Sequence, residues 1–163
     1  MNFSYKQDLV LMVRSLYFCM EEQWAELARI YDISPAQQHI LFILTTNQKT
    51  LTPSEISEIG YWHTSTVSRL LKPLKDKGFI TVNQDPKRNR YKQVTITPTG
   101  EEIFQKIIKT ITTKDFFPFK MSFLTEQDLE NFLKVGQKIL DTNKGVSLRK
   151  KIFNAKIEGV NYT

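Results

Sequence analysis

The sequence predicts a mainly α-helical protein of about six helices with one small β-hairpin. Apolar residues recur at helical spacing along most of the chain, and several of these stretches begin with a Ser-Pro or Thr-Pro pair, a common helix start. Two stretches, Phe79–Val82 and Gln93–Ile96, instead alternate as strands do. Between Leu51 and Thr97 the order is capped helix, turn, second helix and hairpin, which predicts a winged helix-turn-helix.

Composition indicates a soluble globular chain of one domain or one elaborated domain, with 163 residues, 40% hydrophobic and 25% charged. The single cysteine, Cys19, excludes an intrachain disulfide framework and fits a reducing cytosol, so we expect a cytoplasmic protein. The apolar run Leu9–Met20 contains Arg14 and is too short to cross a bilayer, so neither export nor membrane insertion is expected.

The first predicted helix runs from Tyr5 to about Ile30 without proline or glycine. Its segment Leu9–Met20 is apolar on more than one face, which is more than one packing partner needs. The helix either belongs to the core or is buried partly against a second subunit. We favour the second interpretation, because the C-terminal half of the chain offers matching apolar helices.

The next two helices carry clear start signals, Ser34-Pro35-Ala36-Gln37 and Thr52-Pro53-Ser54-Glu55. We expect them to bury Ile40, Leu41, Ile43 and Leu44 in the first case, and Ile56 and Ile59 in the second. Gly60 is expected to take a positive φ and end the second of them. His39 has no neighbouring cysteines or carboxylates at ligand spacing, which favours packing over metal binding.

The helix expected over residues 64–77 has two contrasting faces. The apolar side carries Val67, Leu70, Leu71 and Leu74, and the opposite side carries Ser65, Ser68, Arg69, Lys72 and Asp76. Short hydroxyl side chains first and long cations later suit a helix whose start enters the major groove of DNA. Pro73 predicts a bend or an early end near Arg69–Lys72, and Gly78 the final stop.

Positive charge gathers in this helix and in the hairpin that follows it. Thr64–Lys92 holds eight Lys and Arg residues against two acids, an excess as large as the whole chain's +6. Three of the cations, Lys87, Arg88 and Arg90, lie in the expected hairpin tip, residues 85–90. A hairpin with this charge can lie along phosphates or reach a minor groove.

These motifs resemble the MarR family of winged-helix transcriptional regulators. The resemblance rests on LTPSEISEIG, STVSRLLKPLKDKGFI, the DPKRNR wing and VTITPTGEEIF, and covers roughly residues 9–110. Within the family the chain is most similar to the Hpr-type protease-production regulators, through LYFCMEEQWAELARIYDISPAQQHIL. The family pattern implies base-reading candidates Thr64, Ser65, Thr66, Ser68, Arg69 and Lys72, with Arg90 as the wing arginine. Many members have an acid where this chain has Arg88, so a wing that lacks their acid–arginine brace is expected.

After the wing, Thr97-Pro98 begins a helix to about Thr112, and Thr125 caps a last long helix. The aromatic stretch Asp115–Phe123 between them is expected to anchor the helices, with a ligand-pocket wall as the alternative. We expect a dimerisation helix at 1–33, the winged helix-turn-helix at 34–97, dimerisation helices at 98–142 and a basic tail at 143–163, which forms a short helix or stays mobile.

The expected function is that of a sequence-specific dimeric DNA-binding regulator, acting as a repressor on a pseudo-palindromic operator in double-stranded DNA. The alternative is a protein-interaction module that uses the winged helix without DNA. No catalytic constellation, phosphate-binding loop or metal spacing is present, so neither enzyme activity nor a cofactor is expected. A small-molecule effector stays open, and redox sensing is not expected because Cys19 lies in an apolar run where thiols pack as inert residues.

Overall fold

The computed structural model describes residues 3–85, 88–114 and 118–153, with the backbone alone at 88–90. Within these ranges there are seven helices and three strands. The order is α1 (Phe3–Tyr31), α2 (Pro35–Thr46), β1 (Thr50–Leu51), α3 (Pro53–Gly60), α4 (Thr64–Asp76), β2 (Ile80–Asp85), β3 (Arg88–Ile96), α5 (Pro98–Thr112), α6 (Glu126–Lys144) and α7 (Val146–Phe153). The predicted fold class, mainly helical with a small β-hairpin wing, is confirmed.

The three strands form one antiparallel sheet in the order β1-β3-β2. β2 and β3 pair from Ile80 opposite Ile96 outward to Asp85 opposite Arg88, with an irregularity between Gln84 and Asp85. Both strands are longer than predicted. β1 was not predicted, because two residues are too few to show alternation. It places Leu51 opposite Val94 and so attaches the start of the helix-turn-helix to the base of the wing.

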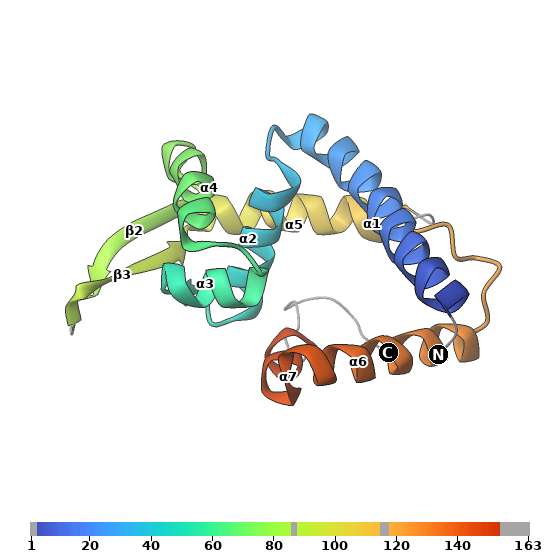
Figure 1. The fold of residues 1–163 in the computed structure, drawn as a ribbon. Helices are drawn as coiled ribbons and strands as arrows, with labels where there is room; N and C mark the ends of the chain where they lie inside the picture. Colours follow the sequence, from blue (N-terminus) through green and yellow to red (C-terminus); the bar gives the residue numbers. More distant parts are fainter. Residues whose placement is uncertain (1–2, 86–87, 115–117, 154–163) are drawn as a thin grey trace.

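The core lies where α2, α3, α4 and α5 meet the sheet. Its buried residues come from α1 to α5, from the loop between α1 and α2, and from the strands: Leu27, Ile33, Ile40, Leu41, Leu44, Ile56, Val67, Leu71, Leu74, Ile80, Val94, Ile96, Phe104 and Ile107. The predicted apolar positions of α2 and α3 are all buried. In Figure 1, α5 extends from the sheet across the molecule to the end where α1 and α6 lie. It therefore belongs to the core at one end and reaches α1 at the other.

Capping fixes the starts of these helices as the sequence indicated. Ser34 with Gln37 and Thr52 with Glu55 form complete capping boxes, and Thr125 with Asp128 forms a third at α6. Thr97 accepts a hydrogen bond from the Gly100 amide at the start of α5. Side-chain and backbone hydrogen bonds from Thr125 hold the pKa of Asp128 below its usual value, as expected of a carboxylate that caps a helix.

One prediction about the helix-turn-helix is wrong, and another is wrong in part. Gly60 does not take the positive φ; Tyr61 does, at 57°. Gly60 serves instead to admit the ring of Trp62, which a β-carbon at this position would overlap. For α4 a bend or an early end near Arg69–Lys72 was predicted; the early end is absent, because the helix continues through Pro73 to Asp76, and the bend stays a prediction. A proline lacks only one amide donor, and here the Pro73 carbonyl still accepts from Lys77 at 3.0 Å in the last turn.

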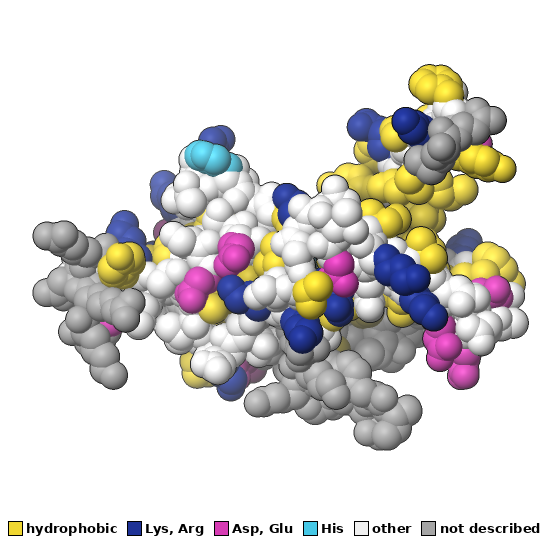
Figure 2. Space-filling view, turned by 60° about the horizontal axis from the view of Figure 1, so that its bottom comes forward, with side chains coloured by type: hydrophobic (Ala, Val, Ile, Leu, Met, Phe, Trp, Pro, Cys, Tyr) yellow, Lys and Arg dark blue, Asp and Glu magenta, His cyan; other side chains and the backbone are white. Residues whose placement is uncertain are grey.

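Large apolar surfaces stay exposed on α1 and α6. Leu27 is the one buried residue of α1 as described, and none is buried on α6. The exposed apolar side chains of these two helices include Leu9, Val10, Leu11, Met12, Val13, Tyr17, Phe18, Phe132, Leu133, Val135 and Ile139. Figure 2 shows hydrophobic side chains gathered at the end of the molecule away from the wing. In the aromatic stretch, residues 115–117 lie outside the described ranges and Phe123 is 78% exposed.

The first part of the predicted tail forms α7, one of the two forms expected for it. α7 packs on α6 and contacts α3, where Lys151 forms an ion pair of 3.1 Å with Glu58. Arg149 binds Asp141 at 2.5 Å. Two cations of the predicted basic tail are therefore paired within the chain. Across the described residues, no helix is long and apolar enough to cross a membrane.

Candidate nucleic-acid interface

α4 is held by its apolar face. Val67, Leu71 and Leu74 are buried and Leu70 is half-buried, as the helical spacing of these residues predicted. The turn before α4 is fixed by the hydroxyl of Ser57, which donates to the carbonyl of Trp62 at 2.6 Å. At the other end of α4, the ammonium of Lys77 binds the carboxylate and carbonyl of Asp32. The orientation of the exposed face is thus set from both ends.

The ring of Trp62 meets His39 of α2 edge to face, with centroids 5.4 Å apart. His39 also stacks on Phe42, with centroids 5.8 Å apart. Burial lowers the pKa of His39, because a protonated imidazole loses hydration there. The prediction that His39 packs rather than binds metal is consistent with this setting. Its aromatic contacts fix the Trp62 side of the turn.

The outward face of α4 carries the predicted polar residues. Thr64, Ser65, Ser68, Arg69 and Lys72 are exposed, whereas Thr66 is half-buried. Thr66 is thus the least accessible of the six base-reading candidates. The other five follow one another along the side opposite the core, with hydroxyl groups in the first turns and cations in the next.

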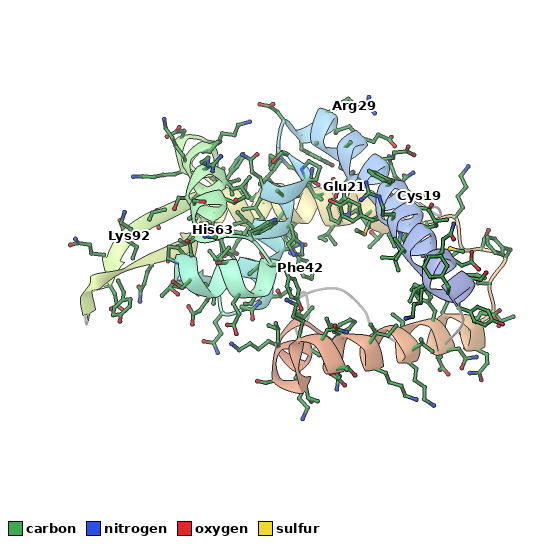
Figure 3. The ribbon with its side chains drawn as sticks, in the orientation of Figure 1. Cys19, Glu21, Arg29, Phe42, His63 and Lys92 are labelled. Carbon is green, nitrogen blue, oxygen red and sulfur yellow. The ribbon has the colours of Figure 1, made fainter. Side chains whose placement is uncertain are left out.

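His63 caps α4 and was not among the predicted site residues. Its Nδ1 accepts from the Ser65 amide at 3.3 Å and lies 2.8 Å from the Ser65 hydroxyl oxygen. The signal that could have revealed it is its place directly before the helix, but histidine is not among the preferred capping residues. Figure 3 shows His63 at the start of α4 and Lys92 on the wing, at the same end of the molecule.

The wing is formed by β2 and β3 beside α4. Lys92 is exposed on β3, opposite Gln84. Arg88 and Arg90 belong to β3, but only their backbone is described, and Lys87 lies outside the described residues. The expectation of a wing without the acid–arginine brace concerns these side chains and stays a prediction.

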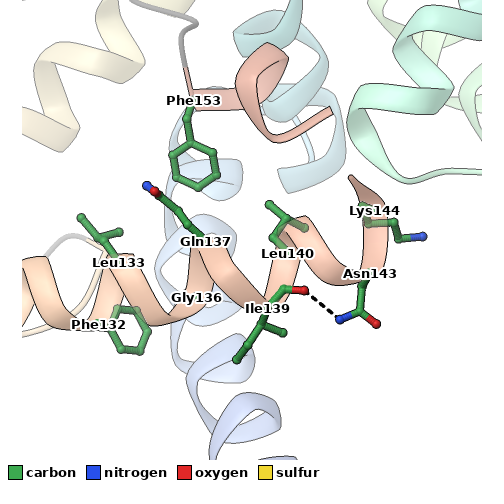
Figure 4. A pocket seen from close by; sticks show the side chains of 9 residues that line it. All are labelled: Phe132, Leu133, Gly136, Gln137, Ile139, Leu140, Asn143, Lys144 and Phe153. Carbon is green, nitrogen blue, oxygen red and sulfur yellow. Dashed lines mark hydrogen bonds between the residues drawn. The ribbon is translucent and has the colours of Figure 1, made fainter. Parts of the chain in front are cut away.

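A second concave surface lies far from α4, between α6 and α7. It has a volume of about 460 Å³ and is lined mainly by apolar side chains, among them Phe132, Leu133, Leu140 and Phe153. Figure 4 shows Phe153 of α7 above Gln137 of α6, with Asn143 bonded to the carbonyl of Ile139 at 2.8 Å. This groove offers apolar contact and no cluster of charged groups.

Two other predicted features can be placed. Cys19 is exposed on α1, so the expectation that its thiol packs inside an apolar run is wrong for the single chain. In the described ranges, no group of three or more His, Cys, Asp or Glu residues is arranged to hold a metal ion.

A helix-turn-helix followed by a two-stranded wing defines a winged helix-turn-helix protein. Residues 33–91 match the MarR family. The chain is also 30% identical over 116 residues to the HTH-type transcriptional regulator Hpr of Bacillus mycoides (strain KBAB4), which covers 66% of this chain and 61% of that protein. It is 31% identical over 109 residues to Hpr of Bacillus licheniformis, covering 65% of this chain and 51% of that protein.

The chain thus spans about half to three fifths of the length of these relatives. Among solved structures, AbsC from Streptomyces coelicolor, a MarR family transcriptional regulator, superimposes with a TM-score of 0.77 at 14% identity, covering 89% of this chain and 98% of that one. Wild-type MarR from E. coli in its apo form gives 0.66 at 20% identity, covering 81% and 96%. These likenesses concern the fold. Together with the sequence matches they confirm the predicted resemblance: residues 33–91 match the MarR family, and the chain is similar to the Hpr-type regulators.

Proposed function

We propose that this protein is a sequence-specific DNA-binding regulator of transcription. The observation that carries the proposal is the outward face of α4, where exposed Ser65, Ser68, Arg69 and Lys72 lie opposite the apolar face that packs on the core. An amphipathic helix of this kind, beside a projecting hairpin, has the shape and donor set that the major groove accepts. The Hpr relatives are HTH-type transcriptional regulators, which supports the same conclusion.

In this proposal α4 enters the major groove with Thr64, Ser65, Thr66, Ser68, Arg69 and Lys72 facing the bases and nearby phosphates. The wing, with Lys87, Arg88 and Arg90, lies on the backbone or in the minor groove. Half-buried Thr66 takes the smallest part, because its side chain is the least accessible of the set.

We infer that the protein acts as a homodimer. A single chain leaves Val10, Met12 and Val13 of α1 and Phe132 and Val135 of α6 each more than half exposed. Contiguous apolar surface of this kind on a water-soluble chain marks an interaction site. Residues 1–33 and 98–142 supply these helices, with 34–97 as the DNA-binding part and 143–163 as a basic tail. A twofold dimer then favours a pseudo-palindromic operator, with half-sites about one helical turn apart.

We further propose a cytoplasmic repressor, which blocks transcription by occupying a promoter. A transcription assay with purified polymerase on a promoter selected by the protein tests this role. Transcript levels should fall as the regulator is added; a rise would make it an activator.

DNA binding itself is tested by selecting duplexes from a randomised pool with the full-length chain and then measuring affinity across salt concentrations. Each phosphate neutralised by a cation should add close to one unit to the slope of log affinity against log salt. A selected palindromic sequence with a steep slope supports the proposal. No enrichment, or an affinity that salt leaves unchanged, contradicts it.

A further inference from the structure

Two serines on the outward face of α4 have their hydroxyl protons engaged inside the protein. The hydroxyl of Ser68 donates to the carbonyl of Thr64, one turn earlier, at 3.1 Å. This is the usual bond of a helical serine to the carbonyl four residues back. The proton of Ser68 therefore points along the helix and not outward.

The proton of Ser65 is fixed by His63. The backbone amide of Ser65 can only donate, and its acceptor is Nδ1 of His63 at 3.3 Å. With Nδ1 as the acceptor, the ring is in the tautomer that has its proton on the other nitrogen. The hydroxyl oxygen of Ser65, 2.8 Å from the same Nδ1, must then be a donor to it. His63 thus decides the direction of the Ser65 hydroxyl.

Both exposed oxygens consequently offer lone pairs to a partner outside. In the major groove, the donors are the exocyclic amino groups of adenine and cytosine, while guanine and thymine present acceptors at the matching positions. A freely rotating serine can serve either kind of base. Arg69 and Lys72, which follow on the same face, are donors only. Along this face, the two serines therefore act as hydrogen-bond acceptors, and Arg69 and Lys72 act as donors.

We propose that Ser65 and Ser68 each accept a hydrogen bond from the exocyclic amino group of an adenine or cytosine, and that His63 sets this preference at Ser65. This inference rests on the proposed function, since it assumes that α4 faces the bases. It goes further by assigning the chemical group that each serine reads, and by giving His63 a positioning role in base selection.

The experiment uses a duplex selected from a randomised pool by the full-length wild-type protein. At each adenine or cytosine of the half-site, the amino group is deleted by placing purine or 2-pyrimidinone there, which also distinguishes the two bases. Affinities are compared for wild type, Ser65→Ala and Ser68→Ala, with Ser54→Ala as a matched control because Ser54 is an exposed serine on α3. Deletion at the contacted base should weaken wild type about two- to ten-fold and leave the corresponding serine variant unaffected.

Variants of His63 test its role separately. Guanine for adenine, or uracil for cytosine, puts a carbonyl where the amino group stood, and wild type should discriminate against it. In His63→Ala the Ser65 hydroxyl is free to donate, so this discrimination should shrink. In His63→Asn the side-chain oxygen can still cap the helix and accept, so it should persist. Thermal unfolding of both variants shows whether the fold is retained.

Equal losses of DNA affinity for wild type and both serine variants at every amino deletion would overturn the inference. So would a result in which the contribution of Ser65 depends on a guanine or thymine acceptor. Unchanged discrimination in folded His63→Ala overturns the role of His63. If wild type selects no duplex at all, it is the proposed function that fails.

Discussion

The phenol oxygen of Tyr31, at the end of α1, lies 2.5 Å from Oγ1 of Thr110 and 3.0 Å from the carbonyl oxygen of Lys106, both on α5. Nearby, the ammonium of Lys114 binds Glu26 at 2.7 Å. The hydrogen bond to Lys114 lowers the pKa of Glu26. These bonds join α1, with its exposed apolar surface, to the helix that enters the core through Phe104 and Ile107. The position of α1 is therefore linked to that of the winged helix.

Replacing Tyr31 by phenylalanine should lower the free energy of unfolding by about 1–2 kcal/mol, since the hydrogen bonds of the hydroxyl to Lys106 and Thr110 are lost and the ring is kept. Urea denaturation measures the effect. Tyr91→Phe is the matched control, because Tyr91 is 55% exposed on the wing. Equal stability of the two variants would show that the α1–α5 bond contributes nothing measurable.

Gly60→Ala should destabilise the protein by about 1–3 kcal/mol, because the new methyl group overlaps the Trp62 ring. Replacing a helical glycine by alanine ordinarily stabilises a protein, so a loss of unfolding free energy in Gly60→Ala would point to the steric overlap. In a Trp62→Leu background the smaller side chain leaves room, and the same substitution should cost much less. Additive losses in the double variant would contradict the steric explanation.

Gly60 and Trp62 also show which structural features a sequence pattern does not predict. Helix starts are local, so the caps at Ser34, Thr52 and Thr125 could be read directly from neighbouring residues. The role of Gly60 depends on where the ring of Trp62 folds back, which is a tertiary fact. Glycine, which has no β-carbon, is the residue most expected at a positive φ, yet Tyr61 takes that conformation here.

The same distinction holds for the candidate site. The exposed face of α4 could be predicted from helical periodicity, because the apolar residues of this helix recur at regular spacing and leave the opposite side polar. Local rules overestimated the effect of Pro73, since they do not include the tertiary packing that holds α4 against the core. The pairing of His63 with Ser65 needs the positions of side-chain atoms, which no residue pattern gives.

The half-buried ring of His39 should make stability depend on pH. Burial lowers its pKa in the folded protein, so the unfolded chain binds this proton more tightly. The contribution is complete above the ordinary histidine pKa of about 6.5 and is lost as the pH falls from there toward the lowered value. Unfolding free energies between about pH 5 and 8 should show this decline. His39→Phe keeps an aromatic contact with Trp62 and should give a flatter profile; an unchanged slope would assign the pH dependence to other groups.

Self-association should depend on the apolar face of α6. Phe132 is 60% exposed in the single chain, and Phe132→Asp places a charge where we propose that a second copy packs. The dissociation constant measured by sedimentation equilibrium should rise about ten-fold or more. Lys134→Asp makes the control, because it adds an acid on the opposite side of the same helix. If both variants dimerise like wild type, α6 is not the interface.

Arg69→Ala and Lys72→Ala should both weaken DNA binding, but in ways that distinguish base contact from phosphate contact. A residue that binds phosphate lowers the affinity for all duplexes and reduces the salt slope by about one unit. One that binds a base edge costs roughly 1–3 kcal/mol and relaxes the preference at a single position. Each variant is therefore measured on the selected duplex, on its single-base variants and across salt. Lys134→Ala removes an exposed cation from α6 and should leave all three measurements unchanged. Because Arg69 precedes Lys72 on α4, it lies nearer the helix start that enters the groove, and we expect it to show the base-specific pattern.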